Sequence, residues 1–187
     1  MELISLQAKT LLNQWQLQVK LQAHFRLKVM TTGDYSTKEL LQQEEELTLS
    51  SFTNEDAIGL GQELLKLALT QKAPVIVQVR IGEQIIFHSA LSGSSSENDW
   101  WINRKYRVVE KFKHSSMYVR VSFEEKNQSF EEDSGLDNEL YAAHGGGFPI
   151  IVSGTGIVGV ALVSGLPQVE DHKMIIQGLT NFKQAKN

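Results

Sequence analysis

Two short motifs carry the side chains best suited to chemistry. His144 precedes three consecutive glycines, and Asp171 precedes His172 near the start of a predicted helix. Glycines let backbone N–H groups approach a ligand or another subunit closely, and the positive end of a helix dipole attracts anions. The motifs therefore predict that His144 and His172 converge on one pocket or interface, as ligands or proton carriers. The alternative is that the histidines satisfy local hydrogen bonds and the glycines mark a tight chain crossing.

A basic stretch beginning at Arg104 and Lys105 is the second candidate for ligand binding. Three more cations follow on the same predicted helix, Arg107, Lys111 and Lys113. Arginine can hold a carboxylate or phosphate through two parallel hydrogen bonds, so the helix could clamp a small anion or a haem propionate. The alternative is an ordinary solvated face. We expect Arg104 to line one site with His144 and His172.

The candidate binding residues all lie in the second half of the chain. They are Arg104, Lys105, His114, His144, Gly145, Gly146, Gly147, Asp171 and His172. No two histidines have the i, i+4 spacing of a helical metal site, and H-E-x-x-H is absent, so no metal site is expected. The G-x-G-x-x-G run at 154–159 precedes β-branched residues rather than a helix, which favours a hairpin over a dinucleotide loop. No G-x-S-x-G elbow accompanies His144, so the sequence does not favour an enzyme.

Composition excludes several classes of protein. The 187 residues include no cysteine, which excludes a disulfide scaffold and thiolate chemistry and fits a reducing cytosol. The net charge is -4, which argues against nucleic-acid binding. No apolar run approaches the roughly 18 residues of a membrane span, and no secretory signal precedes the domain. We therefore expect a cytoplasmic protein without nucleic-acid or membrane partners.

The first 29 residues differ from the rest. They carry a net charge of +3 against -4 for the whole chain. Apolar and polar residues alternate strictly from Trp15 to Val29, which is a strand pattern, although a strand of that length is unusual. Two interpretations follow: an edge strand or arm that joins a partner, or an appendage outside the domain, either flexible or not native. The predicted boundaries are therefore an extension over 1–35 and a single domain over 36–187.

The remaining chain predicts an α/β fold of the α+β type. Strands are predicted at four runs, 75–80, 84–88, 148–153 and 157–163. Ser36 and Thr53 are typical helix N-caps, each with an acidic residue three positions later. Further helices are predicted over 98–113 and after Pro167, since apolar residues recur there at helical spacing.

The order and spacing of several motifs resemble one family. These motifs run from Trp101 to Lys105, from Tyr141 to Pro149 and from Val163 to Gln168, and they end with the pair Asp171-His172. Between about Leu40 and Phe182 the chain resembles the uncharacterised protein family 0303. That family is a branch of the haem-degrading-like domains, which also include the GlcG-type and HbpS-type proteins.

This resemblance implies a profilin-like α-β-α sandwich with a mainly antiparallel sheet of about five strands and flanking helices. It also implies a homo-oligomer. Members of the wider superfamily bind or degrade haem, or accompany cobalamin enzymes, whereas this branch has no settled activity. We therefore expect an oligomeric, non-catalytic scaffold or small-ligand-binding protein. The alternative is a haem-binding or haem-degrading protein, with His114, His144 or His172 as axial ligand and the basic helix holding the propionates.

Overall fold

The N-terminal segment contains a helix where a strand was predicted. The computed structural model describes residues 12–20 and 31–186, and the chain forms two compact units, residues 1–34 and 35–187. Residues 12–20 are helical and exposed, so the strand prediction is wrong over 15–20, and residues 21–29 lie outside the described part. A lone strand leaves its backbone unpaired, whereas a helix satisfies it internally, and leucine, glutamine and lysine favour helices.

A four-stranded antiparallel sheet forms the centre of the second unit. Its strands are β1 (Ile76–Ile81), β2 (Gln84–Ala90), β3 (Gly147–Val152) and β4 (Gly156–Ser164), in the order β2-β1-β4-β3. All three pairings are antiparallel, which confirms the four predicted strands. The expected count of about five was too high, because Leu49 adds only a single parallel bridge, to Val152, at the β3 edge.

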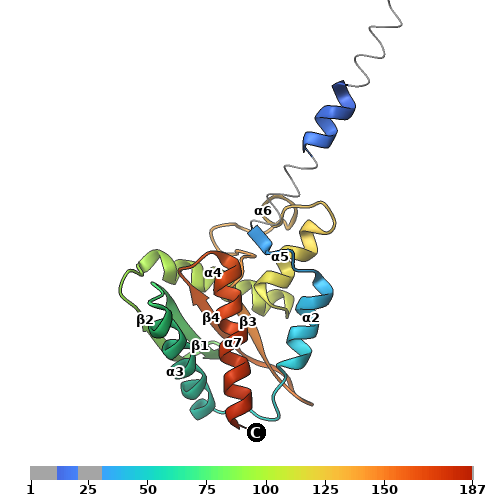
Figure 1. The fold of residues 1–187 in the computed structure, drawn as a ribbon. Helices are drawn as coiled ribbons and strands as arrows, with labels where there is room; N and C mark the ends of the chain where they lie inside the picture. Colours follow the sequence, from blue (N-terminus) through green and yellow to red (C-terminus); the bar gives the residue numbers. More distant parts are fainter. Residues whose placement is uncertain (1–11, 21–30, 187) are drawn as a thin grey trace, which may run out of the picture. The chain divides into compact units, whose positions relative to one another are not determined.

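Helices cover both faces of the sheet, which confirms the predicted sandwich. One face carries α3 (Asn54–Gln71) and α7 (Gln168–Lys186), and the other carries α4 (Ser96–Phe112) (Figure 1). Alternate residues of β1 supply the two cores: Val77 and Val79 pack with α3 and α7, whereas Ile76 packs with Ile102 and Val109 of α4. Burial on both faces fixes the register of β1, because a slip of one residue would move each side chain to the opposite face of the sheet.

Two predicted caps start the first two helices of this unit. Ser36 and Glu39 form a reciprocal capping box at α2 (Thr37–Glu46), and Thr53 and Asp56 form another at α3. Each cap satisfies backbone donors that the first helical turn leaves free. No helix within the described part of the chain is long and apolar enough to cross a membrane.

A third group of elements was not predicted. It comprises α5 (Ser116–Glu124) and the short α6 (Phe130–Asp133), which lie between the predicted helix at 98–113 and the predicted strand at 148–153. Phe130 is buried among Val108, Val119 and Ala143. This small core holds the segment that leads into β3, and it therefore positions His144 at the edge of the sandwich.

Candidate functional site

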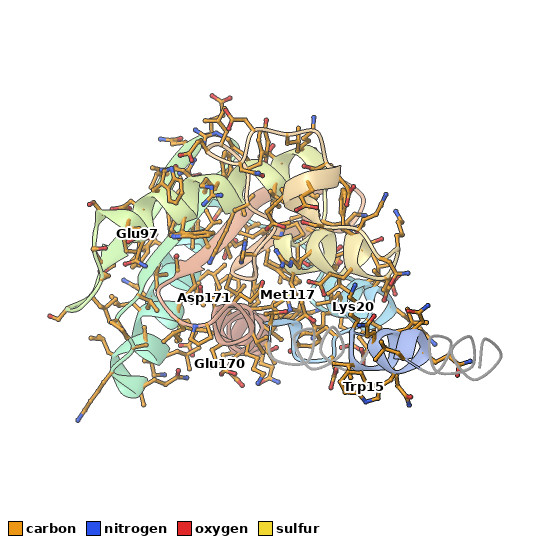
Figure 2. The ribbon with its side chains drawn as sticks, turned by 90° about the horizontal axis from the view of Figure 1, so that it is seen from above. Trp15, Lys20, Glu97, Met117, Glu170 and Asp171 are labelled. Atoms are coloured by element: carbon orange, nitrogen blue, oxygen red, sulfur yellow. The ribbon has the colours of Figure 1, made fainter. Side chains whose placement is uncertain are left out.

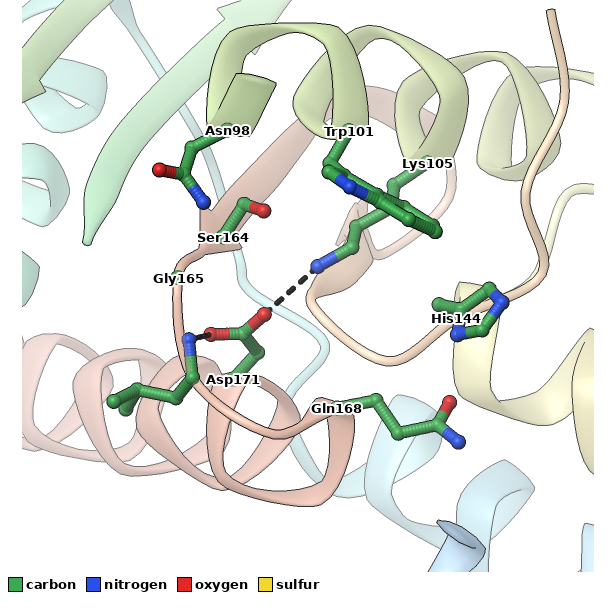
Figure 3. Close-up of a pocket in the computed structure, with 9 residues that line it drawn as sticks. Asn98, Trp101, Lys105, His144, Ser164, Gly165, Gln168 and Asp171 are labelled. Carbon is green, nitrogen blue, oxygen red and sulfur yellow. Dashed lines mark hydrogen bonds and ion pairs between the residues drawn. The ribbon is translucent and has the colours of Figure 1, made fainter. Parts of the chain in front are cut away.

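A pocket of about 200 Å³ opens where α4, the end of β4 and the start of α7 meet (Figure 3). Its lining is mostly polar and comes from Asn98, Trp101, Lys105, His144, Ser164, Gly165, Leu166, Gln168 and Asp171. Three of the predicted residues, Lys105, His144 and Asp171, are therefore brought together in one pocket.

A buried ion pair between Lys105 and Asp171 lies at this pocket. Lys105 Nζ lies 2.8 Å from Asp171 Oδ2 and donates to the carbonyl oxygen of Val163 at 3.0 Å. Asp171 Oδ1 accepts from the backbone N–H of Leu166 at 3.0 Å. The two side chains are only 3% and 2% exposed. Figure 2 shows Asp171 on the sheet-facing side of α7, with Glu170 on the opposite side. The pair thus joins α4 to α7 beside the end of β4.

Burial acts on both partners of this pair in opposite directions. Desolvation lowers the pKa of Lys105, although the nearby carboxylate opposes the change. Desolvation also raises the pKa of Asp171, although the ammonium group and two backbone N–H groups oppose it. Both shifts weaken the preference for the charged forms that an exposed lysine and aspartate would have.

The glycine run forms a tight crossing beside this pair. Gly146 has a φ of +108°, and a Cβ atom there would overlap the carbonyl oxygen of Val163 and lie 2.9 Å from Asp171 Cβ. A Cβ atom at Gly145 would overlap the carbonyl oxygen of Gln168. Gly147 donates its N–H to Ser116 Oγ at 2.9 Å. The glycines therefore allow close packing, and the one polar contact made with the pocket lining is from Gly145 N–H to Gln168 Oε1 at 3.1 Å.

His144 lines the pocket, and its imidazole contacts Glu131, which is not part of the lining. Its Nε2 lies 3.4 Å from Glu131 Oε1, and its ring meets the Trp101 ring edge-on, with centroids 5.0 Å apart. The hydrogen bond with His144 lowers the pKa of Glu131 to about 2, against a smaller opposing effect of burial. Arg120 also contacts Glu131, at 2.7 Å. A histidine oriented by a carboxylate in this way can carry a proton at the pocket wall.

His172 has a different environment from its neighbour Asp171. Its side chain is fully buried, and Nε2 lies 2.8 Å from Gln43 Oε1. Its ring packs against Tyr35 and Phe148, and burial lowers its pKa to about 4. The pocket lining does not include it, so His172 belongs to the core as a neutral, hydrogen-bonded side chain.

Arg104 also lies apart from the pocket. Its guanidinium lies over the rings of Trp100 and Trp101, at 4.0 and 4.4 Å, and contacts the carbonyl oxygen of Tyr141 at 3.5 Å. Burial lowers the pKa of Arg104, whereas Glu139 and Glu131 oppose the change. The prediction that Arg104, His144 and His172 line one site is therefore wrong, since only His144 reaches the pocket.

His114 is held in a separate cluster. Its Nδ1 lies 2.8 Å from Glu44 Oε2, and its ring lies 4.3 Å from the Tyr118 ring. Glu44 is buried and also accepts the backbone N–H of Ser115 at 2.7 Å. The arrangement fixes the direction of the imidazole and leaves 36% of the side chain exposed.

Sequence reasoning missed four polar or aromatic residues of the lining, namely Asn98, Trp101, Ser164 and Gln168. It placed Lys105 among the candidates but not at the centre of the site. A signal was present: Ile102, Lys105 and Val109 share one helical face, and the first and last of these are buried apolar residues. A lysine on an apolar face requires a buried partner.

The sequence is similar to those of a known protein family. Residues 52–180 match the family model described as haem degrading protein HbpS-like. A UPF0303 protein of Streptomyces avermitilis is 52% identical over 144 residues, which are 77% of this chain and 88% of that protein. A UPF0303 protein of Psychromonas ingrahamii is 43% identical over 149 residues, covering 80% and 94% of the two chains.

Solved structures give the same result. The crystal structure of the Ybr137w protein matches with a TM-score of 0.77 and 29% identity, covering 89% of this chain and 96% of that one. The PduOC:haem complex matches with a TM-score of 0.59 and 14% identity, covering 70% and 94%. At 14% identity, the similarity to the PduOC:haem complex shows a shared fold alone.

The pocket does not fit haem. Its volume of about 200 Å³ is below the roughly 300–1,000 Å³ of sites for drug-sized ligands. A porphyrin is at least as large as such a ligand, so it would not fit in this pocket. The histidine in its lining, His144, directs Nε2 to Glu131, and Lys105 is already neutralised by Asp171. Among the described residues, no three histidine, aspartate or glutamate side chains are grouped as metal ligands.

Proposed function

Because the chain belongs to the UPF0303 family of HbpS-like proteins, we propose that it binds a small molecule in the pocket between α4, β4 and α7. One observation carries this proposal: a compact polar pocket contains a buried ion pair and further polar groups that have hydrogen-bonding capacity to spare. Buried polar groups are ordinarily paired. Unused groups that converge on one concave site are therefore the feature expected of a binding site.

The unused groups are mainly donors. Asn98 Oδ1 accepts from Ser95 N–H, and Gln168 Oε1 accepts from Gly145 N–H, so each amide keeps its NH₂ group for a ligand. The hydroxyl of Ser164 and the indole N–H of Trp101 add two more donors. The pair Lys105–Asp171 cancels its own charge. A small neutral molecule with acceptor oxygens, such as a carbonyl or hydroxyl compound, suits this lining better than an anion does.

Binding can be tested by NMR of the indole N–H groups. Glycolamide and a panel of small neutral amides and polyols should shift the Trp101 signal while leaving Trp15 unchanged, since Trp101 lines the pocket and Trp15 does not. The variant Ser164→Ala should weaken binding of an active compound about three- to tenfold, the value of one hydrogen bond. Ser122→Ala, on α5, is the matched control. If no compound moves the Trp101 signal, the pocket is not a binding site.

Haem binding is the second candidate, and one observation at His114 favours it. A carboxylate that accepts from Nδ1 of a histidine orients Nε2 for a metal, and Glu44 is in this position. If haem binds there, titration with hemin should give a Soret band that His114→Ala removes. His88→Ala is the matched control, because His88 is similarly exposed and faces Asp99 at 3.6 Å. A Soret band unchanged in His114→Ala would exclude this ligand.

We further propose that the protein is a homo-oligomer, as the family resemblance implies. Light scattering at micromolar concentration should give a mass several times 21.0 kDa. A single monomer peak would contradict it.

A further inference from the structure

We propose that Lys105 is a nucleophile that forms an imine with a small neutral aldehyde or ketone held in the pocket. The inference rests on the proposed function, because it assumes that the pocket admits a small carbonyl compound. It goes beyond binding, since it assigns a covalent step to one side chain. Four observations support it: the access to Lys105, its contacts, the close approach of Gly146 and the donors in the pocket lining.

The amine of Lys105 is buried but not sealed in. It is among the residues that line the pocket, although its side chain is only 3% exposed. Figure 3 shows the side chain extending from α4 past Trp101 toward Asp171, so that Nζ lies at the pocket rather than at the outer surface. A buried lysine loses its proton more readily than an exposed one, and amines activated in this way serve as nucleophiles.

Its contacts can produce the neutral amine. Both partners of Nζ, the Val163 carbonyl at 3.0 Å and Asp171 Oδ2 at 2.8 Å, are acceptors, and Asp171 is placed to take a proton from the ammonium group. The nitrogen lone pair that this transfer frees can attack a carbonyl carbon. A purely structural lysine gains little from such burial, because the desolvation of a buried pair offsets most of its attraction.

A glycine lets the backbone pass close to the amine. A Cβ atom at Gly146 would lie 2.7 Å from Lys105 Nζ. A side chain there would therefore compete with Nζ for its position at the pocket. The pocket lining also includes the NH₂ groups of Asn98 and Gln168 and the hydroxyl of Ser164, which can hold the oxygens of the ligand.

Asp171 can supply the proton transfers that the reaction needs. Asp171 Oδ2 first takes a proton from the Lys105 ammonium group, which leaves a neutral amine beside a protonated carboxyl. The amine then adds to the carbonyl carbon while that carboxyl proton moves to the carbonyl oxygen. Asp171 then takes a proton from the nitrogen and returns it to the hydroxyl group, which leaves as water. The products are a protonated imine, paired with the aspartate, and one water molecule. Atoms and charge balance, and no oxidant or reductant takes part.

Reductive trapping tests the proposal on the full chain. Glycolaldehyde, a small neutral aldehyde, is added at neutral pH with cyanoborohydride, and the alkylated lysines are identified by peptide mass spectrometry. We expect Lys105 to be labelled at least about tenfold faster than Lys66, because the pocket holds the aldehyde beside its amine and burial lowers the pKa of that amine. Lys66 is the comparator because its side chain is 75% exposed. Labelling of Lys105 no faster than Lys66, or not at all, overturns the proposal.

Two further measurements separate the causes. Asp171→Asn preserves size but removes the proton carrier, so labelling of Lys105 should slow at least about tenfold, whereas Asp133→Asn on α6 should have no effect. An unchanged rate in Asp171→Asn overturns the role of Asp171. Glycolamide has nearly the shape of glycolaldehyde but cannot form an imine. If glycolamide shifts the Trp101 signal while Lys105 stays unlabelled, the binding site stands and the imine fails; if neither occurs, both proposals fail.

Discussion

Asp171 and His172 are consecutive residues of α7, yet their side chains lie in different parts of the molecule. Asp171 pairs with Lys105 at the pocket, whereas His172 lies in the core, bonded to Gln43. Successive residues of a helix point about 100° apart, so one turn of α7 serves the pocket and the core together. Changes at the two positions should therefore have separable effects.

His172 should make stability depend on pH. Its pKa of about 4 in the folded protein lies below the ordinary 6.5, so between these values the unfolded chain binds a proton that the folded chain does not. The stability present above pH 6.5 is thus lost as the pH falls through this window. We expect a loss of about 2 kcal/mol between pH 7 and pH 5.

Urea unfolding at both pH values measures this loss. His172→Gln removes the titrating group. The unfolding free energy of this variant should therefore fall by about 2 kcal/mol less between pH 7 and pH 5 than that of the unchanged protein. His88→Gln, a change at an exposed histidine, is the control. If His172→Gln and the unchanged protein lose stability in parallel, the burial of His172 does not govern the pH dependence.

The pair Lys105–Asp171 should behave as one unit in a double-mutant cycle. Lys105→Met alone leaves a buried carboxylate unpaired, and Asp171→Asn alone leaves a buried ammonium unpaired. Each single change should cost about 3–5 kcal/mol. The double variant should cost less than the two singles together, by about 1–3 kcal/mol. Strict additivity in urea unfolding would show that the contact contributes nothing.

Gly146→Ala should be strongly destabilising. Its φ of +108° is unfavourable for alanine, and the new methyl group would overlap the carbonyl oxygen of Val163. Strain and overpacking together predict a cost of about 2–4 kcal/mol. Gly154→Ala is the matched control, since Gly154 also has a positive φ, of +75°, but open space around it. Equal costs for the two variants in thermal or urea unfolding would contradict the packing argument.

Residues 1–29 should be dispensable for folding. They precede the compact unit that begins at Tyr35 and the family match that begins at residue 52. A chain shortened to begin at Met30 should keep its melting temperature. A fall of several degrees, roughly 1 kcal/mol or more, would show that the segment is integral to the domain.

Much of the fold could be predicted because its signals are local. Ser36 and Thr53 each predict the start of a helix, because an acidic side chain three residues later completes a capping box. The β-branched runs predict the four strands with errors of one or two residues at their ends. The helix at 12–20 was missed because alternation alone does not decide between strand and helix when no partner strand is known. Helix α5 was missed because Met117, Val119, Val121 and Phe123 recur at every second position, which is not helical spacing. Helix α6 was missed because it has only 4 residues.

The site was predicted only in part, for a geometric reason. Residue type identified Lys105, His144 and Asp171, but the pocket depends on which face of each helix meets the sheet. Arg104 and Lys105 are neighbours, and only the second enters the pocket. Ser164 and Gln168 carry no chemical signal of their own. They become part of the site because β4 ends and α7 begins beside α4.

The separation of Lys105 and Asp171 in the chain has a consequence for synthesis. The two residues are 66 positions apart, and β4, which pairs with β1 at the centre of the sheet, also lies in the later half. Until β4 and α7 have been made, β1 lacks one of its neighbours and the amine of Lys105 lacks its counter-charge. A domain generally folds as a unit during synthesis. The pocket, and anything that depends on it, therefore arises only when the last helix leaves the ribosome.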